Sequence, residues 1–314
     1  MSYSLGFDGG GTKTDCAVLD GRGFVIGEGR GGPSNPLRSG FDNAFSSLRQ
    51  AASRAIAAAG IRPDQITHVC AGLAGAGRRS VVRRAMVFLA GEFPRALANV
   101  VTDYEVALEA AAGAGPAVVL IAGTGSVAYG RNAEGETARA GGYGPWIGDE
   151  GSAFEIGRRA VAAVARARDS DAPVTVLSDT ISSALHCADW DDLMLRIAKN
   201  PDDVFPKLFP VVAEAANSGD SAAKEILFAS AIGLGNLAMI VIRRLGMKDE
   251  PFPLVKCGGA FGHSQLLDSL LDSVLASGAL RAKISRLEIS PAVGAARMAA
   301  RLSEPPPQAA SHGA

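Results

Sequence analysis

The chain has 314 residues, which is long enough for two domains. Its 31 Lys and Arg residues balance 32 Asp and Glu residues, so bulk charge gives no attraction to nucleic acid or to an anionic membrane. Hydrophobic residues make up 47% of the chain, which excludes a mainly disordered protein. With no targeting segment and no apolar run of the ~18 residues that a membrane span needs, the sequence predicts a soluble cytoplasmic α/β protein.

The first predicted elements are three short strands, over residues 3–8, 14–20 and 24–29, separated by glycine turns. This pattern is typical of an antiparallel meander. An apolar stripe at helical spacing then predicts a helix from Phe41 that ends at Gly60. After it we expect a strand, a helix, a strand and a helix, over 66–71, 80–90, 99–102 and 104–112.

The second half begins as the first does. After the break at 113–116, a strand over 117–122 leads into a Gly-Thr-Gly-Ser turn and a second meander, which indicates an internal duplication. A capping-box pattern of Ser152 and Glu155 predicts the start of a helix, and Ser290 followed by Pro291 predicts another. The other elements expected are helices over 190–199, 203–217 and 221–245 and a strand over 254–257.

These elements predict the domain organisation. Residues 1–116 form a small N-terminal domain and residues 117–290 a larger C-terminal one. The helix 291–302 is expected to pack back onto the first domain, and 303–314 is expected to be a disordered tail. The cysteines have no metal-ligand spacing and are expected to be reduced thiols; they are Cys16, Cys70, Cys187 and Cys257.

Three glycine clusters follow predicted strands, at 8–12, 123–126 and 258–261. Without side chains, successive backbone amides can converge on an anion, and a Thr or Ser hydroxyl adds a donor. None of the clusters is a Walker A loop, and none is a dinucleotide fingerprint, because at the two meanders a strand follows where a Rossmann unit has a helix. Taken singly, each is typical of a tight turn, but the repeated strand-turn-strand unit favours a joint role.

These clusters carry a resemblance to the actin/hexokinase/Hsp70 superfamily of ATP-dependent phosphotransferases. Residues 8–14 (DGGGTKT) resemble its first phosphate loop, 121–126 (IAGTGS) its second, and 257–260 (CGGA) its adenosine motif. Residues 142–152 (GYGPWIGDEGS), with Ser34-Asn35 and Thr102-Asp103, are most similar to the N-acetylglucosamine kinase branch, grouped with the BadF/BadG/BcrA/BcrD-type ATPases. The resemblance extends to Leu302. It implies two ribonuclease-H-like domains, each a mixed sheet flanked by helices, with ATP and sugar in the cleft between them.

The resemblance also implies a role for each matching residue. ATP phosphates would be held by Gly10, Gly11 and Thr12, and from the opposite side by Thr124 and Gly125. Gly258 and Gly259 would border the adenosine, and Asp8 would lie near Mg²⁺, directly or through water. Asp103 would be the catalytic base. The sugar site would be lined by Asn35, Asp103, Ser126, Tyr143, Gly144 and Asp149.

Some of these residues also have purely structural interpretations. Asp103 stands where a helix N-cap is expected, and Asn35 could stabilise a turn before a proline. Asp149 and Glu150 could be first-turn acids favoured by a helix dipole.

Two residues depart from the family pattern. Tyr143 stands where family members often have Trp, and Pro145 stands where some have His. These departures concern the pocket for the acylamino group rather than phosphoryl transfer.

The implied reaction is ATP-dependent phosphorylation of an amino sugar at O6, with N-acetylglucosamine as the best single candidate and glucosamine and N-acetylmuramic acid as alternatives. A homodimer is the family expectation.

A second possible class of function is an ATPase activator of a radical enzyme, but such a protein needs cysteines that hold an iron–sulfur cluster, and none here lies in a matching loop. A non-catalytic regulator is expected to lack the base or to carry a DNA-binding extension. The ROK family is disfavoured because its zinc signature is missing.

Overall fold

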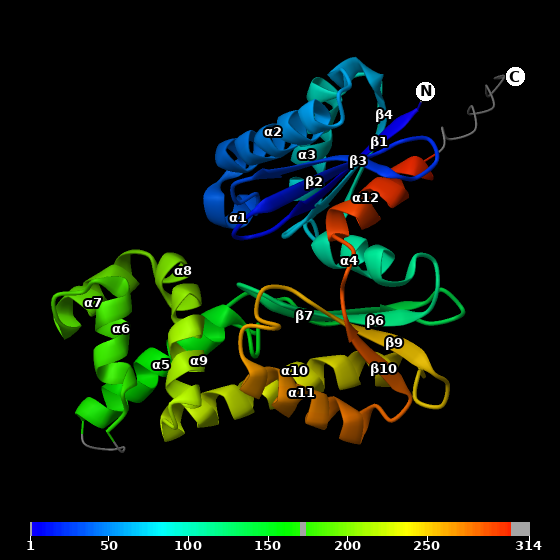
Figure 1. The fold of residues 1–314 in the computed structure, drawn as a ribbon. Helices are drawn as coiled ribbons and strands as arrows, with labels where there is room; N and C mark the ends of the chain where they lie inside the picture. Colours follow the sequence, from blue (N-terminus) through cyan, green and yellow to red (C-terminus); the bar gives the residue numbers. More distant parts are fainter. Residues whose placement is uncertain (1, 170–173, 303–314) are drawn as a thin grey trace, which may run out of the picture. The chain divides into compact units, whose positions relative to one another are not determined.

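A computed structural model describes residues 2–169 and 174–302 of the chain. The expected tail at 303–314 lies outside the described residues. The chain divides into two compact units, Met1–Gly113 with Ile289–Ala314, and Ala114–Glu288. Each unit is built on one five-stranded sheet (Figure 1).

The sheet of the first unit has the order β3-β2-β1-β4-β5. The central strand β1 pairs antiparallel with β2 and parallel with β4, while β3 and β5 form the edges. The expected meander is therefore confirmed. The strands are β1 (Tyr3–Gly9), β2 (Thr14–Leu19), β3 (Val25–Gly31), β4 (Ile66–Leu73) and β5 (Leu97–Thr102).

The sheet of the second unit repeats this arrangement with the order β10-β9-β6-β7-β8. Its central strand β6 pairs antiparallel with β7 and parallel with β9, so the five strands of one sheet match those of the other in order and direction. The mixed sheets confirm the predicted fold class, and their common topology agrees with an internal duplication. The strands are β6 (Ala117–Ala122), β7 (Ser126–Arg131), β8 (Thr137–Gly141), β9 (Phe252–Cys257) and β10 (Ala282–Arg286).

Helices cover both faces of the first sheet. On one face, α2 (Phe41–Ala58) and α3 (Arg79–Glu92) bury a core with Leu5 and Phe7 of β1. On the other face lie α4 (Asp103–Ala112) and α12 (Pro291–Ala300). The remaining helical turns of this unit are α1 (Pro36–Ser39) and η1 (Pro63–Gln65).

Helix α12 approaches β1 so closely that only glycine fits at Gly6. A Cβ there would overlap the backbone of Ala292 and Ala296. The Ser290 side chain caps α12 by accepting a hydrogen bond from the Ala292 amide, and Pro291 is the first helical residue, as predicted from the sequence. The last helix of the chain is thereby anchored on the central strand of the first sheet.

In the second unit the helices pack into one large core with the sheet. One helix was expected over 203–217, but a 3₁₀ turn, η2, interrupts it, because Pro206 and Pro210 lack the amide hydrogen that a continuous helix needs. Helices α6 and α11 and strand β10 were not among the elements expected from the sequence. The helical elements are α5 (Ala153–Arg168), α6 (Leu177–Leu185), α7 (Trp190–Lys199), α8 (Pro201–Val204), η2 (Phe205–Leu208), α9 (Phe209–Asn217), α10 (Ser221–Arg244) and α11 (Gln265–Gly278).

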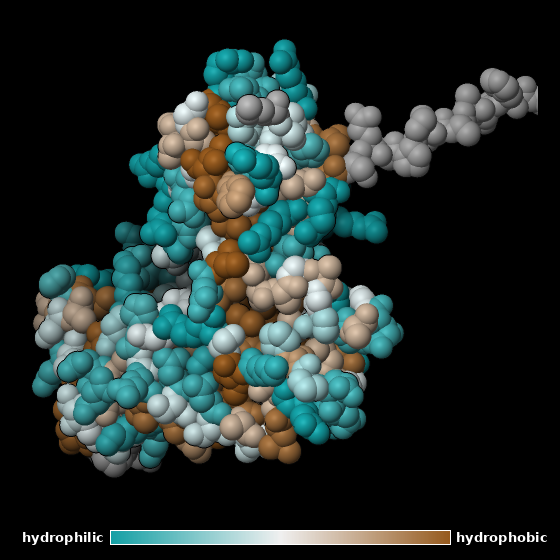
Figure 2. Space-filling model, turned by 45° about the vertical axis from the view of Figure 1, so that its right-hand side comes forward, coloured by the Kyte–Doolittle hydropathy of each residue, from teal (hydrophilic) through white to brown (hydrophobic). Residues whose placement is uncertain are grey.

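Helix α10 corrects the expectation that no apolar run has the length of a membrane span. By length and composition it could cross a membrane, with a mean hydropathy of 2.0 over its most apolar 18 residues. However, 56% of that window is buried inside the protein, and residues such as Leu227, Leu234 and Ala238 are core residues. The core helix of a soluble protein has the same character. Figure 2 shows hydrophilic residues over much of the face that it draws, with hydrophobic residues exposed between them.

Candidate active site

The first glycine loop follows β1 and is tied to two neighbouring segments. The Gly10 carbonyl accepts hydrogen bonds from the amides of Ser34 and Asn35, both at 3.0 Å, and the Gly9 carbonyl accepts one from the Ala74 amide at 2.8 Å. A Cβ at Gly9 would overlap the Ser34 hydroxyl oxygen, so the segment that carries Asn35 lies directly against the loop. Thr12, at the far end of the loop, is exposed.

Asn35 has the structural role that the sequence left open. It is the N-cap of α1, where its Oδ1 accepts a hydrogen bond from the Leu37 amide at 3.0 Å, and Pro36 is the first helical residue. This cap fixes the orientation of the side-chain amide. An amide group has a second end with two donors, so capping is compatible with contact to a ligand.

Asp8 and Asp103 lie at the same end of the first sheet, where the parallel strands β1, β4 and β5 have their carboxyl ends. Asp8 is in register with Gly72 of β4, Gly72 with Val101 of β5, and Asp103 follows β5 by one residue. Burial raises the pKa of Asp8 to about 7, and the negative charge of Asp103 is the next largest cause. Two carboxylates therefore lie near each other where the carboxyl ends of parallel strands meet, beside the first glycine loop.

Asp103 is not the N-cap of α4, so that interpretation is wrong. The N-cap is Thr102, whose amide and hydroxyl both donate to Oε2 of Glu105, at 2.8 and 2.5 Å. Asp103 is the first helical residue, and its Oδ1 accepts a hydrogen bond from the Tyr104 amide at 3.1 Å. Because Thr102 and Glu105 form the cap, the start of α4 does not require a carboxylate at Asp103.

In the second unit, the loop after β6 lies against Asp149. A Cβ at Gly125 would come within 2.8 Å of Asp149 Oδ2, so only glycine leaves room for this carboxylate. Asp149 is 5% exposed and has a positive φ of 63°, one of two such non-glycine residues among those described. A buried residue in a left-handed conformation is typical of sites where the surrounding structure imposes the geometry.

Asp149 and Glu150 are not first-turn acids of a helix, as the alternative interpretation had it. Helix α5 begins only at Ala153, and its first-turn acid is Glu155. The Ser152 side chain caps it by accepting from the Glu155 amide at 3.2 Å, while Glu155 Oε2 accepts from the Gly151 amide at 2.6 Å. The predicted Ser152 cap is thus confirmed, but the Glu155 carboxylate accepts from the Gly151 amide instead of the Ser152 amide of a standard capping box.

The segment around Tyr143 and Gly144 forms an exposed turn. Gly144 has a φ of 96°, and its carbonyl accepts from the amides of Ile147 and Gly148 at 3.1 and 2.9 Å. Tyr143 is 60% exposed, and its ring lies 4.8 Å from the Arg139 guanidinium. Trp146 on the same turn is 69% exposed, and no role was predicted for it, although its ring offers both an apolar face and an N–H donor to a ligand.

Ser126 directs its hydroxyl toward the same segment. It is buried at the start of β7 and donates a hydrogen bond to the Glu150 carbonyl at 2.7 Å. This bond ties the second glycine loop to the Gly-Asp-Glu-Gly stretch. Of the expected sugar-site residues of this unit, Ser126 and Asp149 therefore lie together at the loop, and Tyr143 and Gly144 lie on the turn that leads to it.

The third glycine cluster, at 258–261, is hydrogen-bonded to the end of β6, the strand that precedes the second glycine cluster. Gly258 has a φ of 109°, and a Cβ there would overlap the Ala122 carbonyl. Two residues later, the Ala260 amide donates to that same carbonyl at 3.0 Å. The structure thus brings the expected adenosine loop, with Gly258 and Gly259, next to the loop of Thr124 and Gly125.

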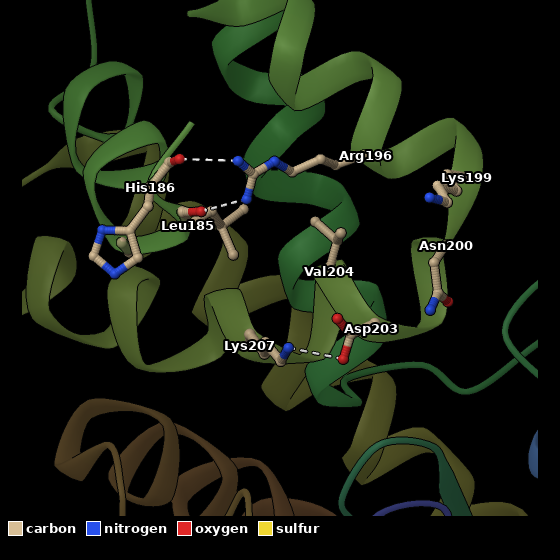
Figure 3. A pocket seen from close by; sticks show the side chains of 9 residues that line it. Leu185, His186, Arg196, Lys199, Asn200, Asp203, Val204 and Lys207 are labelled. Atoms are coloured by element: carbon tan, nitrogen blue, oxygen red, sulfur yellow. Dashed lines mark hydrogen bonds and ion pairs between the residues drawn. The ribbon is translucent and has the colours of Figure 1, made fainter. Parts of the chain in front are cut away.

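A separate cavity of about 320 Å³ lies among the helices α6, α7 and α8 (Figure 3). Arg196 donates to the carbonyls of Leu185 and His186 at 2.8 and 2.9 Å, and Lys207 pairs with Asp203 at 2.7 Å. None of the predicted site residues lines this cavity. Its charged side chains stabilise the local helices, and it is not part of the candidate site.

The fold and these loops define a two-unit protein with a glycine loop after the first strand of each sheet. The chain belongs to the BadF/BadG/BcrA/BcrD ATPase family, whose model matches residues 5–299. It is 31% identical over 311 residues, 94% of this chain and 97% of the relative, to the N-acetyl-D-glucosamine kinase of Dictyostelium discoideum. These matches confirm the family resemblance.

Two further comparisons agree. The chain is 31% identical over 272 residues to the N-acetylmuramic acid/N-acetylglucosamine kinase of Clostridium acetobutylicum, covering 85% of this chain and 88% of that one. A solved structure from Chromobacterium violaceum has a TM-score of 0.77 at 24% identity, covering 94% of this chain and 98% of that one. At this identity the second likeness supports the fold alone.

Proposed function

We propose that this protein is an ATP-dependent kinase that phosphorylates an amino sugar at O6, with N-acetylglucosamine as its preferred acceptor. The relatives named above are sugar kinases, and they match nearly all of this chain. The observation that carries the proposal is the position of Asp103, which lies near Asp8 at the carboxyl end of the parallel strands, where the first glycine loop begins.

The glycine loops would bind the nucleotide. The Gly11 amide and the Thr12 hydroxyl would donate to phosphate oxygens, as would Thr124 and the Gly125 amide. The Gly10 amide already donates to the Lys13 carbonyl at 3.0 Å, so Gly10 would contribute the close approach of its backbone rather than a free donor. The exposed backbone of Gly258 and Gly259 allows a flat base to approach closely. Each of these contacts uses backbone or hydroxyl donors, which suit an anion that is bound and released in every turnover.

The residues around Asp8 fit a magnesium ion that arrives with ATP. Among the described residues no group of three or more His, Cys, Asp or Glu side chains could hold a metal by itself. Mg²⁺ usually keeps several waters and binds through one or two carboxylates plus substrate phosphates. Burial and a second acid raise the pKa of Asp8 because they disfavour its charged form, and a nearby cation would stabilise that charged form. Asp8 would hold the ion, which neutralises charge on the phosphates.

Asp103 would act as the base. Phosphoryl transfer has a loose transition state, so the main tasks are to position the acceptor and to balance charge. A carboxylate within about 2.6–3.2 Å of the sugar O6 hydroxyl orients it, and accepts its proton as the new oxygen–phosphorus bond forms. Asn35 and Asp149, with Ser126, Tyr143 and Gly144, would bind the remaining hydroxyl and amide groups of the sugar.

The direct test is a coupled assay of ADP release with Mg-ATP and a panel of glucose, glucosamine, N-acetylglucosamine and N-acetylmuramic acid. We expect the highest kcat/KM with N-acetylglucosamine, and no sugar-dependent turnover with its 6-deoxy derivative, which lacks the acceptor. ADP release that no sugar stimulates would contradict the proposal. Light scattering of the purified protein would test the homodimer that we also expect.

The activator alternative has its own simple test. Cys16 and Cys70 are buried within β2 and β4, and burial raises the pKa of both thiols, which disfavours the thiolate form that binds iron. An iron-free, colourless protein with sugar kinase activity would exclude an iron–sulfur activator.

A further inference from the structure

A lysine is buried beside the expected adenosine loop. Lys256, two residues before Gly258, has a side chain that is only 6% exposed. Its Nζ lies 2.7 Å from Asp272 Oδ1 and 3.7 Å from Asp268 Oδ1, and both acids belong to α11. Lysine is almost never fully buried unless it is paired, so the position of this charge depends on the two carboxylates.

One of these carboxylates holds the loop itself. Asp268 Oδ2 accepts a hydrogen bond from the Gly262 amide at 2.7 Å. Its other oxygen, Oδ1, is buried and makes no hydrogen bond among the described residues, so the Lys256 ammonium at 3.7 Å compensates its charge. Lys256 therefore stabilises the acid that fixes Gly262.

A second cation fixes the same loop from the neighbouring strand. Arg286 of β10 is in register with Lys256 of β9, and its guanidinium donates to the Phe261 carbonyl at 2.8 Å. A Cβ at Gly262 would overlap this guanidinium, and Gly262 has a positive φ of 81°. The Phe261 ring is buried, with its centroid 5.9 Å from Lys256 Nζ.

The loop from Gly258 to Ser264 is thus fixed at several points. Ala260 is bonded to the end of β6, Phe261 to Arg286, and Gly262 to Asp268, and Ser264 caps α11. The exposed glycines at its beginning are the part left open to a ligand.

We propose that Lys256 is a positioning residue for nucleotide binding. Through Asp268 and Asp272 it holds the Gly258–Ser264 loop in the conformation that accepts a purine nucleotide. Without it, two carboxylates four residues apart on α11 repel each other, and the Gly262 contact loosens. The nucleotide must then order the loop as it binds, which weakens its affinity. The inference rests on the proposed function only in placing a nucleotide at Gly258 and Gly259.

The test measures ADP binding by calorimetry in the absence of sugar. We expect Lys256→Met to raise the Kd for ADP by about 10–100-fold. Lys256→Arg keeps the charge, and its Kd for ADP should stay within about threefold of the wild-type value. Lys283→Met is the matched control, because Lys283 is exposed on the neighbouring strand β10. In the kinase assay, the KM for ATP should rise while the KM for sugar and kcat stay within about twofold.

The result distinguishes positioning from general stability. If Lys256→Met does not fold, Asp272→Asn removes the nearer carboxylate at a half-exposed position and should raise the Kd for ADP severalfold. A folded Lys256→Met or Asp272→Asn protein with unchanged ADP affinity overturns the proposal, as do equal losses of ADP and sugar affinity. If the wild-type protein binds ADP but phosphorylates no sugar, the proposed function fails, while the ADP affinities of the variants still test the role of Lys256. A wild-type protein that binds no ADP overturns the inference about Lys256.

Discussion

Burial, and after it the negative charge of Asp103 at the start of α4, raises the pKa of Asp8 at the end of β1. The relationship depends on strand β4, which lies between their strands and contributes Gly72 at the register position that joins them. A Cβ at Gly72 would overlap the side chain of Val106 on α4, so glycine there allows the helix to approach the sheet. The acid pair is thus produced by strand order and by one close helix–sheet contact.

The first prediction concerns Asp103. Asp103→Asn keeps the size of the side chain and one oxygen that can accept from the Tyr104 amide, but it removes the base, so kcat should fall by about 10²–10⁴-fold while the Kd for the sugar changes little. Steady-state kinetics and calorimetry with sugar measure the two quantities. Asp64→Asn, at an exposed acid of the same unit, serves as the control. Turnover of Asp103→Asn within tenfold of wild type would show that Asp103 is not the base.

The second prediction follows from the pKa of Asp8, about 7 in the folded protein against 3.8 as its ordinary value. Between these values Asp8 binds more protons in the folded state than in the unfolded state, so its contribution to stability is complete below about 3.8 and is lost as the pH rises towards 7. For one group the slope is at most about 1.4 kcal/mol per pH unit. Urea unfolding in EDTA from pH 5 to 8 should show this decline in the wild type and a shallower one in Asp8→Asn. Equal slopes would contradict the assignment.

The third prediction concerns the contact of Gly125 with Asp149. Gly125→Ala places a methyl group 2.8 Å from Asp149 Oδ2, which must move either the carboxylate or the loop. We expect a loss of about 1–3 kcal/mol in the free energy of unfolding and a more than tenfold lower kcat/KM. Gly123→Ala is the stability control, since a Cβ there meets nothing within 4 Å. Equal stability of the two variants would mean that the contact is not tight.

The fourth prediction concerns the anchoring of α12 on β1. Gly6→Ala would push the helix backbone away and should lower the free energy of unfolding by about 3 kcal/mol or more. Gly77→Ala, where a Cβ has open space, should change it by less than about 1 kcal/mol. Urea unfolding of both variants measures the difference. A Gly6→Ala protein as stable as Gly77→Ala would mean that α12 does not pack on β1 this closely.

Much of the fold could be predicted because its signals are local. Alternation and glycine turns predicted both meanders, and Ser290 with Pro291 predicted the start of α12 correctly. The prediction of one helix over 203–217 was wrong because it followed the apolar stripe and gave no weight to Pro206 and Pro210, although the effect of a proline on a helix is equally local. Asp103 was a plausible cap by position, yet the neighbouring Thr102 takes that role with Glu105.

The sequence by itself determined the three glycine clusters, the strands that precede them and the family motifs, because turn chemistry and periodicity depend only on neighbouring residues. Only the tertiary structure decided that Asp103 lies near enough to Asp8 to raise its pKa further, that Asp149 lies against Gly125, and that Lys256 is paired with two acids of α11. Contacts between residues far apart in the chain depend on strand order, register and helix packing, which together determine how burial and charge act on each side chain.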